Sequence, residues 1–129
     1  MTDPIASFIN SVKMAAEKRL PTVTVPHSAL KVEIAKVLTK AGYLKSSGVK
    51  GKRVKKLLEV ELAYKAGVSP ISHVRRISKP GKRVYAGVDG INSVREGRGM
   101  SVISTPKGIL SDKEARKEKV GGELLFEIW

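Results

Sequence analysis

The stretch VISTPKGILSDKEARK, residues 102–117, combines an apolar run, a turn and a helix start. Its first residues are β-branched and extend back to Met100, which favours a strand over residues 100–105. Ser111 and Glu114 have the spacing of a capping box, and Asp112 adds a negative charge near the positive end of the helix dipole. The stretch therefore predicts a strand, a loop and a short helix that begins after Ser111.

The loop between these two elements contains Ser104, Thr105, Lys107 and Gly108. A phosphate-binding P-loop needs a lysine that follows a glycine-rich turn, whereas here the lysine precedes the glycine and Pro106 removes one backbone amide. A nucleotide-binding loop of that kind is excluded. Two interpretations remain open from spacing alone, a structural turn or a contact with RNA, whose minor groove presents hydroxyl groups.

The first half of the chain shows the order α-β-α-β-β. Asp3 and Pro4 have the character of a helix start, and Ser28 is a candidate N-cap with Gly42 at the end of the same helix. Leu30, Ile34, Val37 and Leu38 are expected to form that helix's buried stripe. The predicted elements are a helix from 4 to about 19, a strand over 22–25, a helix over 29–41, a strand from 43, a turn over 46–53 and a strand over 58–64.

The segment KAGVSP, residues 65–70, carries Gly and Pro and marks the predicted domain boundary, with domains over 1–66 and 67–129. The second domain is expected to be β-rich with one short helix. Its predicted strands cover residues 74–77, 83–86, 100–105 and 124–129, with a turn at SKPGK, residues 78–82. The fold class is therefore α/β, of the α+β kind, in two small domains.

The chain is strongly basic, with 25 Lys and Arg against 12 Asp and Glu, a net charge of +13. The first 66 residues hold 13 basic and 5 acidic residues and the remainder 12 and 7, so the excess belongs to the whole chain. Such a balance favours a polyanionic partner, above all nucleic acid. No signal sequence or membrane span is recognisable, so we expect a soluble, intracellular protein.

Catalytic and metal-binding motifs are not found in the sequence. There is no cysteine, and neither His27 nor His73 has a carboxylate at ligand spacing, so we expect no metal and no cofactor. No serine lies in a nucleophile-elbow motif. We therefore expect a protein that is not an enzyme.

Two further basic segments are candidates for RNA contact. VKGKRVKK, residues 49–56, contains Lys52 and Lys55 and is equally compatible with a solvated hairpin tip. RRISKPGKRVY, residues 75–85, places Arg83 and Tyr85 on one face of the predicted strand, where a guanidinium and a ring can act on the same ligand. Only 5% of the residues are aromatic, so recognition of RNA shape and backbone is expected rather than stacking of successive bases.

Several motifs together resemble the bacterial family of small-subunit ribosomal protein eight. They are DPIA (3–6), the SALK helix start (28–31), RISKPGKRVY (76–85), STPKGILSDKEARK (104–117) and VGGELLFEIW (120–129). The resemblance covers essentially the whole chain. The sequence departs from the family pattern at Pro106, where the family usually has serine, at Ser7 and at Arg98.

The resemblance implies a cytoplasmic, structural protein of the ribosome that binds the central domain of 16S-type ribosomal RNA and helps to assemble it. It also implies neighbouring small-subunit proteins as partners, binding to its own messenger RNA in some members, and no membrane association. The implied RNA-binding residues are Ser104, Thr105, Lys107, Gly108, Tyr85, Arg83, Lys79, Lys31, Lys52, Lys55, Gly121, Gly122 and Glu123. The alternative is a basic module that binds an acidic protein partner.

Overall fold

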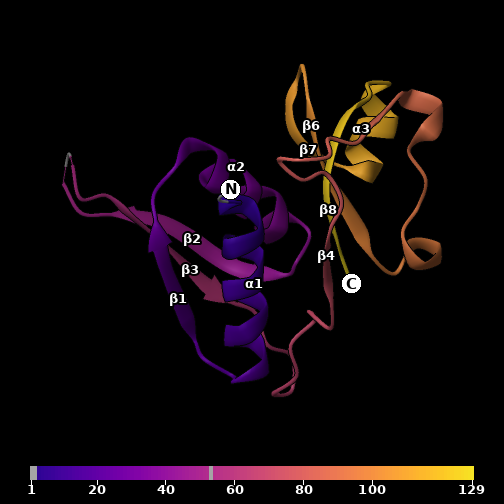
Figure 1. Ribbon diagram of the computed structural model, residues 1–129. Coiled ribbons are helices and arrows are strands. Elements are labelled where there is room, and N and C mark those ends of the chain that lie inside the picture. The colour runs from indigo at the N-terminus through magenta and orange to yellow at the C-terminus, as the bar shows by residue number, and fades with distance from the viewer. Residues whose placement is uncertain (1–2, 53) are drawn as a thin grey trace. The chain divides into compact units, whose positions relative to one another are not determined.

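The computed structural model describes residues 3–52 and 54–129, which form an α+β structure with α-helices and antiparallel sheets (Figure 1). The described chain separates into two compact units. One covers residues 7–72, and the other consists of residues 73–129 together with the described residues up to Ala6. The domain boundary after residue 66 remains a prediction, because a compact unit is not by itself an independently folding domain.

Helix α1, Pro4–Glu17, begins where the sequence predicts. The Asp3 carboxylate accepts a hydrogen bond from the backbone N–H of Ala6 at 3.1 Å, which satisfies one of the open donors of the first turn. The same carboxylate accepts from Nε of Arg76 at 3.1 Å, and the Arg76 side chain is only 8% exposed. The residues of the DPIA motif are thus held by a cap and by a largely buried ion pair.

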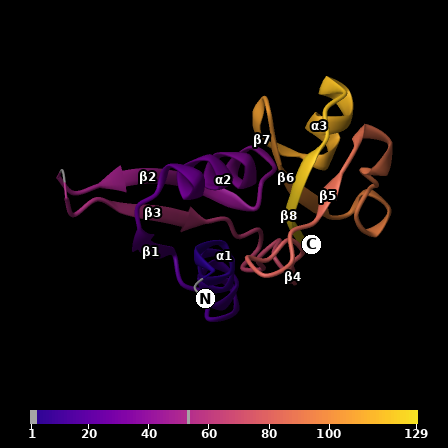
Figure 2. The ribbon, with the colours of Figure 1, turned by 45° about the horizontal axis from the view of Figure 1, so that its top comes forward.

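The unit over residues 7–72 contains a three-stranded sheet in the order β1-β3-β2, with β1 Thr22–Pro26, β2 Leu44–Lys50 and β3 Leu57–Leu62. Leu58, Val60 and Leu62 are buried, while Glu59 and Glu61 between them are half-buried. This alternation confirms the predicted amphipathic strand as far as Leu62, but β3 ends there, two residues before the predicted end at residue 64. Figure 2 shows the β2–β3 hairpin extending beyond the helices.

Helix α2, Ala29–Lys40, has the predicted cap, since the Ser28 side chain accepts from the backbone N–H of Lys31. Gly42 follows the helix end with φ of +91°, a conformation that glycine adopts without strain. The predicted buried stripe is confirmed for Ile34, Val37 and Leu38 and wrong for Leu30, which is 40% exposed. Ala35, which the sequence did not assign to the stripe, is fully buried beside Ile34.

The turn predicted over residues 46–53 is wrong in its first part. Strand β2 continues to Lys50, pairing Ser47 with Val60 and Lys50 with Leu57. Cross-strand pairing with a well-formed amphipathic strand holds polar and glycine residues in extended conformation here, against their local preference. Residue 53, the last of the predicted turn, lies outside the described residues.

The unit over residues 73–129 is built on a second antiparallel sheet in the order β4-β8-β6-β7, with β5 also paired to β8. Its strands are β4 Val74–Arg76, β5 Tyr85–Ala86, β6 Met100–Thr105, β7 Gly108–Ser111 and β8 Gly122–Ile128. Part of its core consists of Ile91, Ile103 and Ala115, with Leu110 and Leu124 packed against them. The predicted strand over 83–86 is too long, because Arg83 and Val84 lie before β5.

Strand β7 corrects the predicted loop between strand and helix. Thr105 pairs with Gly108, and Ile103 with Leu110, so the chain forms a tight hairpin before helix α3, Asp112–Glu118. The predicted capping box of α3 is confirmed by hydrogen bonds in both directions between Ser111 and Glu114. Two short 3-10 helices that the sequence did not predict, Val88–Gly90 and Arg95–Gly97, connect β5 to β6.

Among the described residues, α1 is the longest helix, and none is both long and apolar enough to cross a membrane.

Candidate nucleic-acid interface

Three of the predicted site residues form a row across the second sheet. Tyr85 of β5 pairs with Glu123 of β8, and Glu123 pairs on its other side with Ser104 of β6. Directly paired residues of antiparallel strands present their side chains to the same face of a sheet. A phenol, a carboxylate and a hydroxyl therefore share one face, and Tyr85 is 68% exposed there.

Two glycines allow the strands under this row to approach closely. A Cβ atom at Gly122 would lie 2.0 Å from the backbone oxygen of Ser104, and one at Gly121 would lie 2.3 Å from that of Ala86. Both contacts are with backbone that cannot turn aside. The predicted site residues Gly121 and Gly122 thus have a structural role that is independent of any ligand.

The turn over Thr105–Gly108 is held by its own side chain. The Thr105 hydroxyl donates to the backbone oxygen of Gly108 at 2.8 Å and accepts from the backbone N–H of Lys107 at 3.1 Å. Gly108 has φ of +113°, which other residues rarely adopt. Ser104 is half-buried at the base of this hairpin, and its hydroxyl has no hydrogen-bond partner within the described chain.

Lys107 lies beside helix α3 rather than free in solvent. Its Nζ is 3.2 Å from Oε2 of Glu118, and both side chains are about half exposed. An exposed pair of this kind contributes little to stability, at most about 1 kcal/mol. The pair instead restricts where the lysine charge lies, while leaving it accessible.

Lys79 belongs to the predicted turn over residues 78–82, which is confirmed by the bridge between Lys79 and Lys82, and Arg83 follows that turn directly. Lys79 is exposed. Arg83 Nη1 is 3.0 Å from Oε2 of Glu123, so Arg83 reaches the row although it does not belong to β5. The prediction that Arg83 lies in the same strand as Tyr85 is wrong, because β5 begins only at Tyr85, but the Arg83 guanidinium still contacts Glu123, the residue paired with Tyr85.

The remaining predicted residues, Lys31, Lys52 and Lys55, belong to the other unit. Lys31 lies in the first turn of α2, where its Nζ donates to the backbone oxygen of Pro26 at 3.1 Å. Lys52 and Lys55 lie at the tip of the β2–β3 hairpin, are exposed, and have no ion pair within the described chain. The backbone N–H of Lys55 donates to the backbone oxygen of Lys52, which closes the tip.

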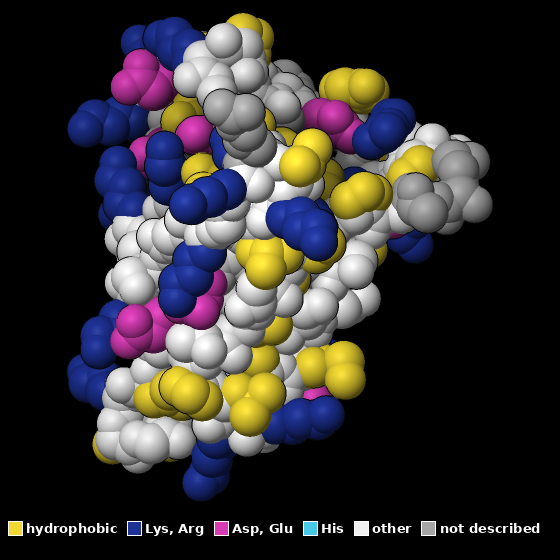
Figure 3. All heavy atoms as spheres, turned by 90° about the vertical axis from the view of Figure 1, so that its left-hand side faces the viewer, with side chains coloured by type: hydrophobic (Ala, Val, Ile, Leu, Met, Phe, Trp, Pro, Cys, Tyr) yellow, Lys and Arg dark blue, Asp and Glu magenta, His cyan; other side chains and the backbone are white. Residues whose placement is uncertain are grey.

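The charged surface fits a polyanion. On the face drawn in Figure 3, Lys and Arg side chains are spread over the surface, and acidic side chains stand beside some of them. Several carboxylates are already paired, among them Glu59 with Lys50 at 2.9 Å and Glu61 with Lys45 at 3.1 Å. The uncompensated charge is therefore positive, as the net charge of +13 requires.

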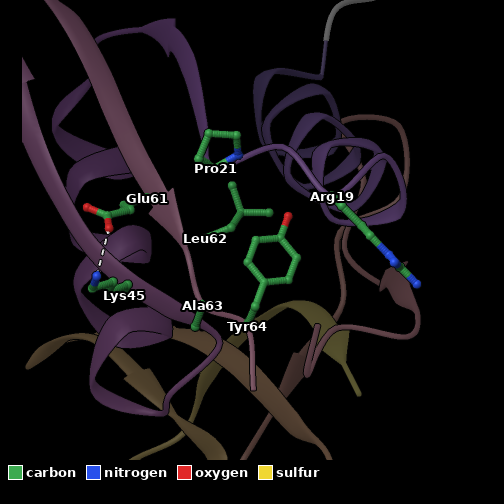
Figure 4. Close-up of a pocket in the computed structure, with 7 residues that line it drawn as sticks. All are labelled: Arg19, Pro21, Lys45, Glu61, Leu62, Ala63 and Tyr64. Carbon is green, nitrogen blue, oxygen red and sulfur yellow. Dashed lines mark ion pairs between the residues drawn. The ribbon is translucent and has the colours of Figure 1, made fainter. Parts of the chain in front are cut away.

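One open pocket, of about 470 Å³, lies in the unit over residues 7–72, and Figure 4 shows its lining. The Tyr64 hydroxyl donates to the backbone oxygen of Leu20 at 2.5 Å, and burial raises the pKa of Tyr64 above 10.0, opposed by the charge of Arg19. Lys45 is paired with Glu61. The polar groups of the pocket thus mainly hold the segment after α1 in place. They do not form a pair of nucleophile and general base.

Among the described residues, no group of three or more His, Cys, Asp or Glu is placed to hold a metal ion. The fold and the surface together define a basic α+β protein. Its polar row, with Tyr85 exposed at one end, and its exposed lysines without ion pairs in the described chain suit a polyanionic ligand.

The chain belongs to the family described as Ribosomal protein S8, whose model matches residues 3–129. It is 46% identical to the small ribosomal subunit protein uS8 of Mycoplasmopsis agalactiae over 129 residues, covering 100% of this chain and 98% of that protein. It is 43% identical to the uS8 of Mycoplasmopsis pulmonis and 46% identical to that of Koribacter versatilis, again over nearly the full length of both chains.

Family membership confirms several sequence-based predictions. The chain is a small-subunit ribosomal protein, a structural constituent of the cytoplasmic ribosome, and its family is not known to be enzymatic. The RNA-binding roles of individual residues stay predictions. The sequence gives no signal for Ser78 and Glu118, because the partners they hold, Glu123 and Lys107, lie 45 and 11 residues away.

Proposed function

We propose that this chain binds the central domain of 16S ribosomal RNA and helps that domain to assemble. The observation that carries the proposal is the row of Tyr85, Glu123 and Ser104 beside the fixed turn over Thr105–Gly108. The row offers hydrogen-bond donors and acceptors on one face of a rigid sheet. It suits the wide minor groove of A-form RNA, which displays 2′-hydroxyls and base edges.

The proposed interface makes two kinds of contact with RNA, one with ribose and base edges and one with phosphates. Ribose and base edges are contacted by the row and by the turn over Thr105–Gly108. Gly121 and Gly122 border this contact and set the backbone beneath it. Phosphates are contacted by lysines, because an ammonium group is a compact point charge. These lysines are Lys31, Lys52, Lys55, Lys79 and Lys107. Phosphate contacts give affinity and salt dependence, while contacts with ribose and base edges select the site.

Chemical footprinting of the purified full-length protein on 16S ribosomal RNA tests the proposal. We expect protection confined to one irregular helix of the central domain at physiological salt. Scattered protection that disappears with moderate salt would reduce the protein to a non-specific RNA binder. Tighter binding to an acidic polypeptide than to the RNA would favour an acidic protein partner instead.

The central-domain fragment alone should bind as tightly as the whole RNA if the site lies within it. Competition by the chain's own messenger RNA, measured with the same fragment, tests whether that transcript carries a similar site.

A further inference from the structure

A buried serine lies directly behind the polar row. Ser78 is fully buried, and its hydroxyl donates to Oε2 of Glu123 at 2.5 Å while accepting from the backbone N–H of Val84 at 3.1 Å. A hydroxyl can make both bonds at once, since it has one donor and two acceptor positions. The serine thus links the backbone before β5 to a carboxylate on β8.

Arg83 fixes the same carboxylate oxygen from the solvent side. Its Nη1 is 3.0 Å from Oε2 of Glu123, and the Glu123 side chain is 19% exposed. The hydrogen bonds from Ser78 and Arg83 therefore both end on Oε2. Within the described chain, Oε1 has no hydrogen-bond donor.

We propose that Ser78 and Arg83 are positioning residues, which hold Glu123 by one carboxylate oxygen so that the other accepts a hydrogen bond from RNA. This inference rests on the proposed function. Ser78 cannot touch RNA itself, because it is fully buried. It acts only through Glu123, whose rotamer would otherwise be free to turn toward solvent.

The chemistry of the free oxygen defines the group that it recognises. A carboxylate accepts hydrogen bonds and repels a phosphate, so its ligand is a ribose 2′-hydroxyl or a base amino group. Because Glu123 lies between Tyr85 and Ser104, this acceptor sits in the middle of the row. A negative charge there costs affinity for any RNA that presents a phosphate at that point, and so it favours one placement of the RNA over others.

A double-mutant cycle tests the inference, with affinity measured at fixed salt for a transcript of the 16S central domain. Ser78→Ala and Glu123→Ala are each expected to weaken binding about tenfold, the effect of losing one hydrogen bond to a charged group. The double variant should bind RNA like Glu123→Ala alone, because Ser78 then has no carboxylate left to position; its other hydrogen bond, from the backbone N–H of Val84, affects RNA binding only if the role of Ser78 is structural. A full tenfold loss from Ser78→Ala in the Glu123→Ala background would show a purely structural role and overturn the inference.

Ser101→Ala is the matched control, since Ser101 is also buried in this sheet, on β6, but pairs with Glu127 rather than Glu123. It should leave RNA affinity unchanged. If Ser78→Ala does not fold, Ser78→Cys keeps a similar volume with a weaker donor, and the same cycle applies. If wild type binds the transcript specifically and the Ser78 variants bind equally well, the inference alone fails; if wild type shows no specificity, the proposed function fails with it.

Discussion

The two basic hairpins of this protein differ in how their turns are held. The β6–β7 turn is short, its threonine hydroxyl bonds to Gly108 and Lys107, and its lysine is paired with Glu118. The β2–β3 tip carries Lys52 and Lys55 without ion pairs in the described chain and exposes Val54 to 97%. The first arrangement suits recognition that depends on geometry, and the second suits attraction that depends on charge.

The support beneath the first hairpin should be the most sensitive to change. We expect Gly122→Ala to destabilise the protein by about 3 kcal/mol, the upper range for overpacking, because the new Cβ would lie 2.0 Å from a backbone oxygen of β6. Thermal and denaturant unfolding measure the loss.

The matched control lies in the other hairpin. A Cβ atom added at Gly48 of β2 would meet no other atom within 4 Å, and the φ of Gly48 is not positive. Gly48→Ala should therefore change stability by less than about 0.5 kcal/mol. Equal effects of the two substitutions would mean that the close approach of β8 and β6 does not matter.

Thr105→Ala should separate the geometry of the first hairpin from its charge. The substitution removes both hydrogen bonds of the hydroxyl within the turn and any bond to RNA, so RNA affinity should fall by about 1–2 kcal/mol. The salt dependence of binding should stay as in wild type, since no phosphate contact is lost.

Thr105→Ser retains the hydroxyl and is expected to bind nearly as tightly as wild type. A serine variant as weak as the alanine variant would show that the methyl group, not the hydroxyl, matters in the turn.

In the unit that contains the β2–β3 hairpin, the Tyr64 hydroxyl holds the segment after α1 by a hydrogen bond to Leu20. Tyr64→Phe removes the hydrogen bond to Leu20, and we expect a loss of about 1 kcal/mol in the free energy of unfolding. Burial raises the pKa of this hydroxyl in the folded state, so the stability it gives is present below pH 10 and is lost as pH rises through the raised pKa. The free energy of unfolding, measured over the alkaline range, should decline less steeply for Tyr64→Phe than for wild type.

Features that depend on residues close together in the sequence could be predicted, whereas those that depend on distant residues could not. Helix caps are signals within four residues, and Asp3, Ser28 and the Ser111–Glu114 box are all confirmed. Strand β7 escapes prediction because four residues between a turn and a cap are too few to show alternation. Ser78 resembles any turn serine in sequence, since its partner Glu123 is 45 residues away and only the folded sheet brings them together.

The second hairpin should respond to charge alone. If Lys52 and Lys55 each contact one phosphate, neutralising either as glutamine reduces the slope of log affinity against log salt concentration by about one unit, and changing both reduces it by about two. The loss in affinity should be largest at low salt and shrink as salt rises, because the counterions that a contact releases matter less in concentrated salt.

Lys36→Gln is the matched control, because Lys36 is an exposed lysine of the same unit but is paired with Glu33. Its slope should stay near that of wild type. Because both tip residues are exposed, stability should change by less than about 0.5 kcal/mol in all these variants, so differences in slope report on RNA contact. An unchanged slope for the double variant would assign the tip lysines to solvent, leaving the first hairpin as the proposed contact with RNA.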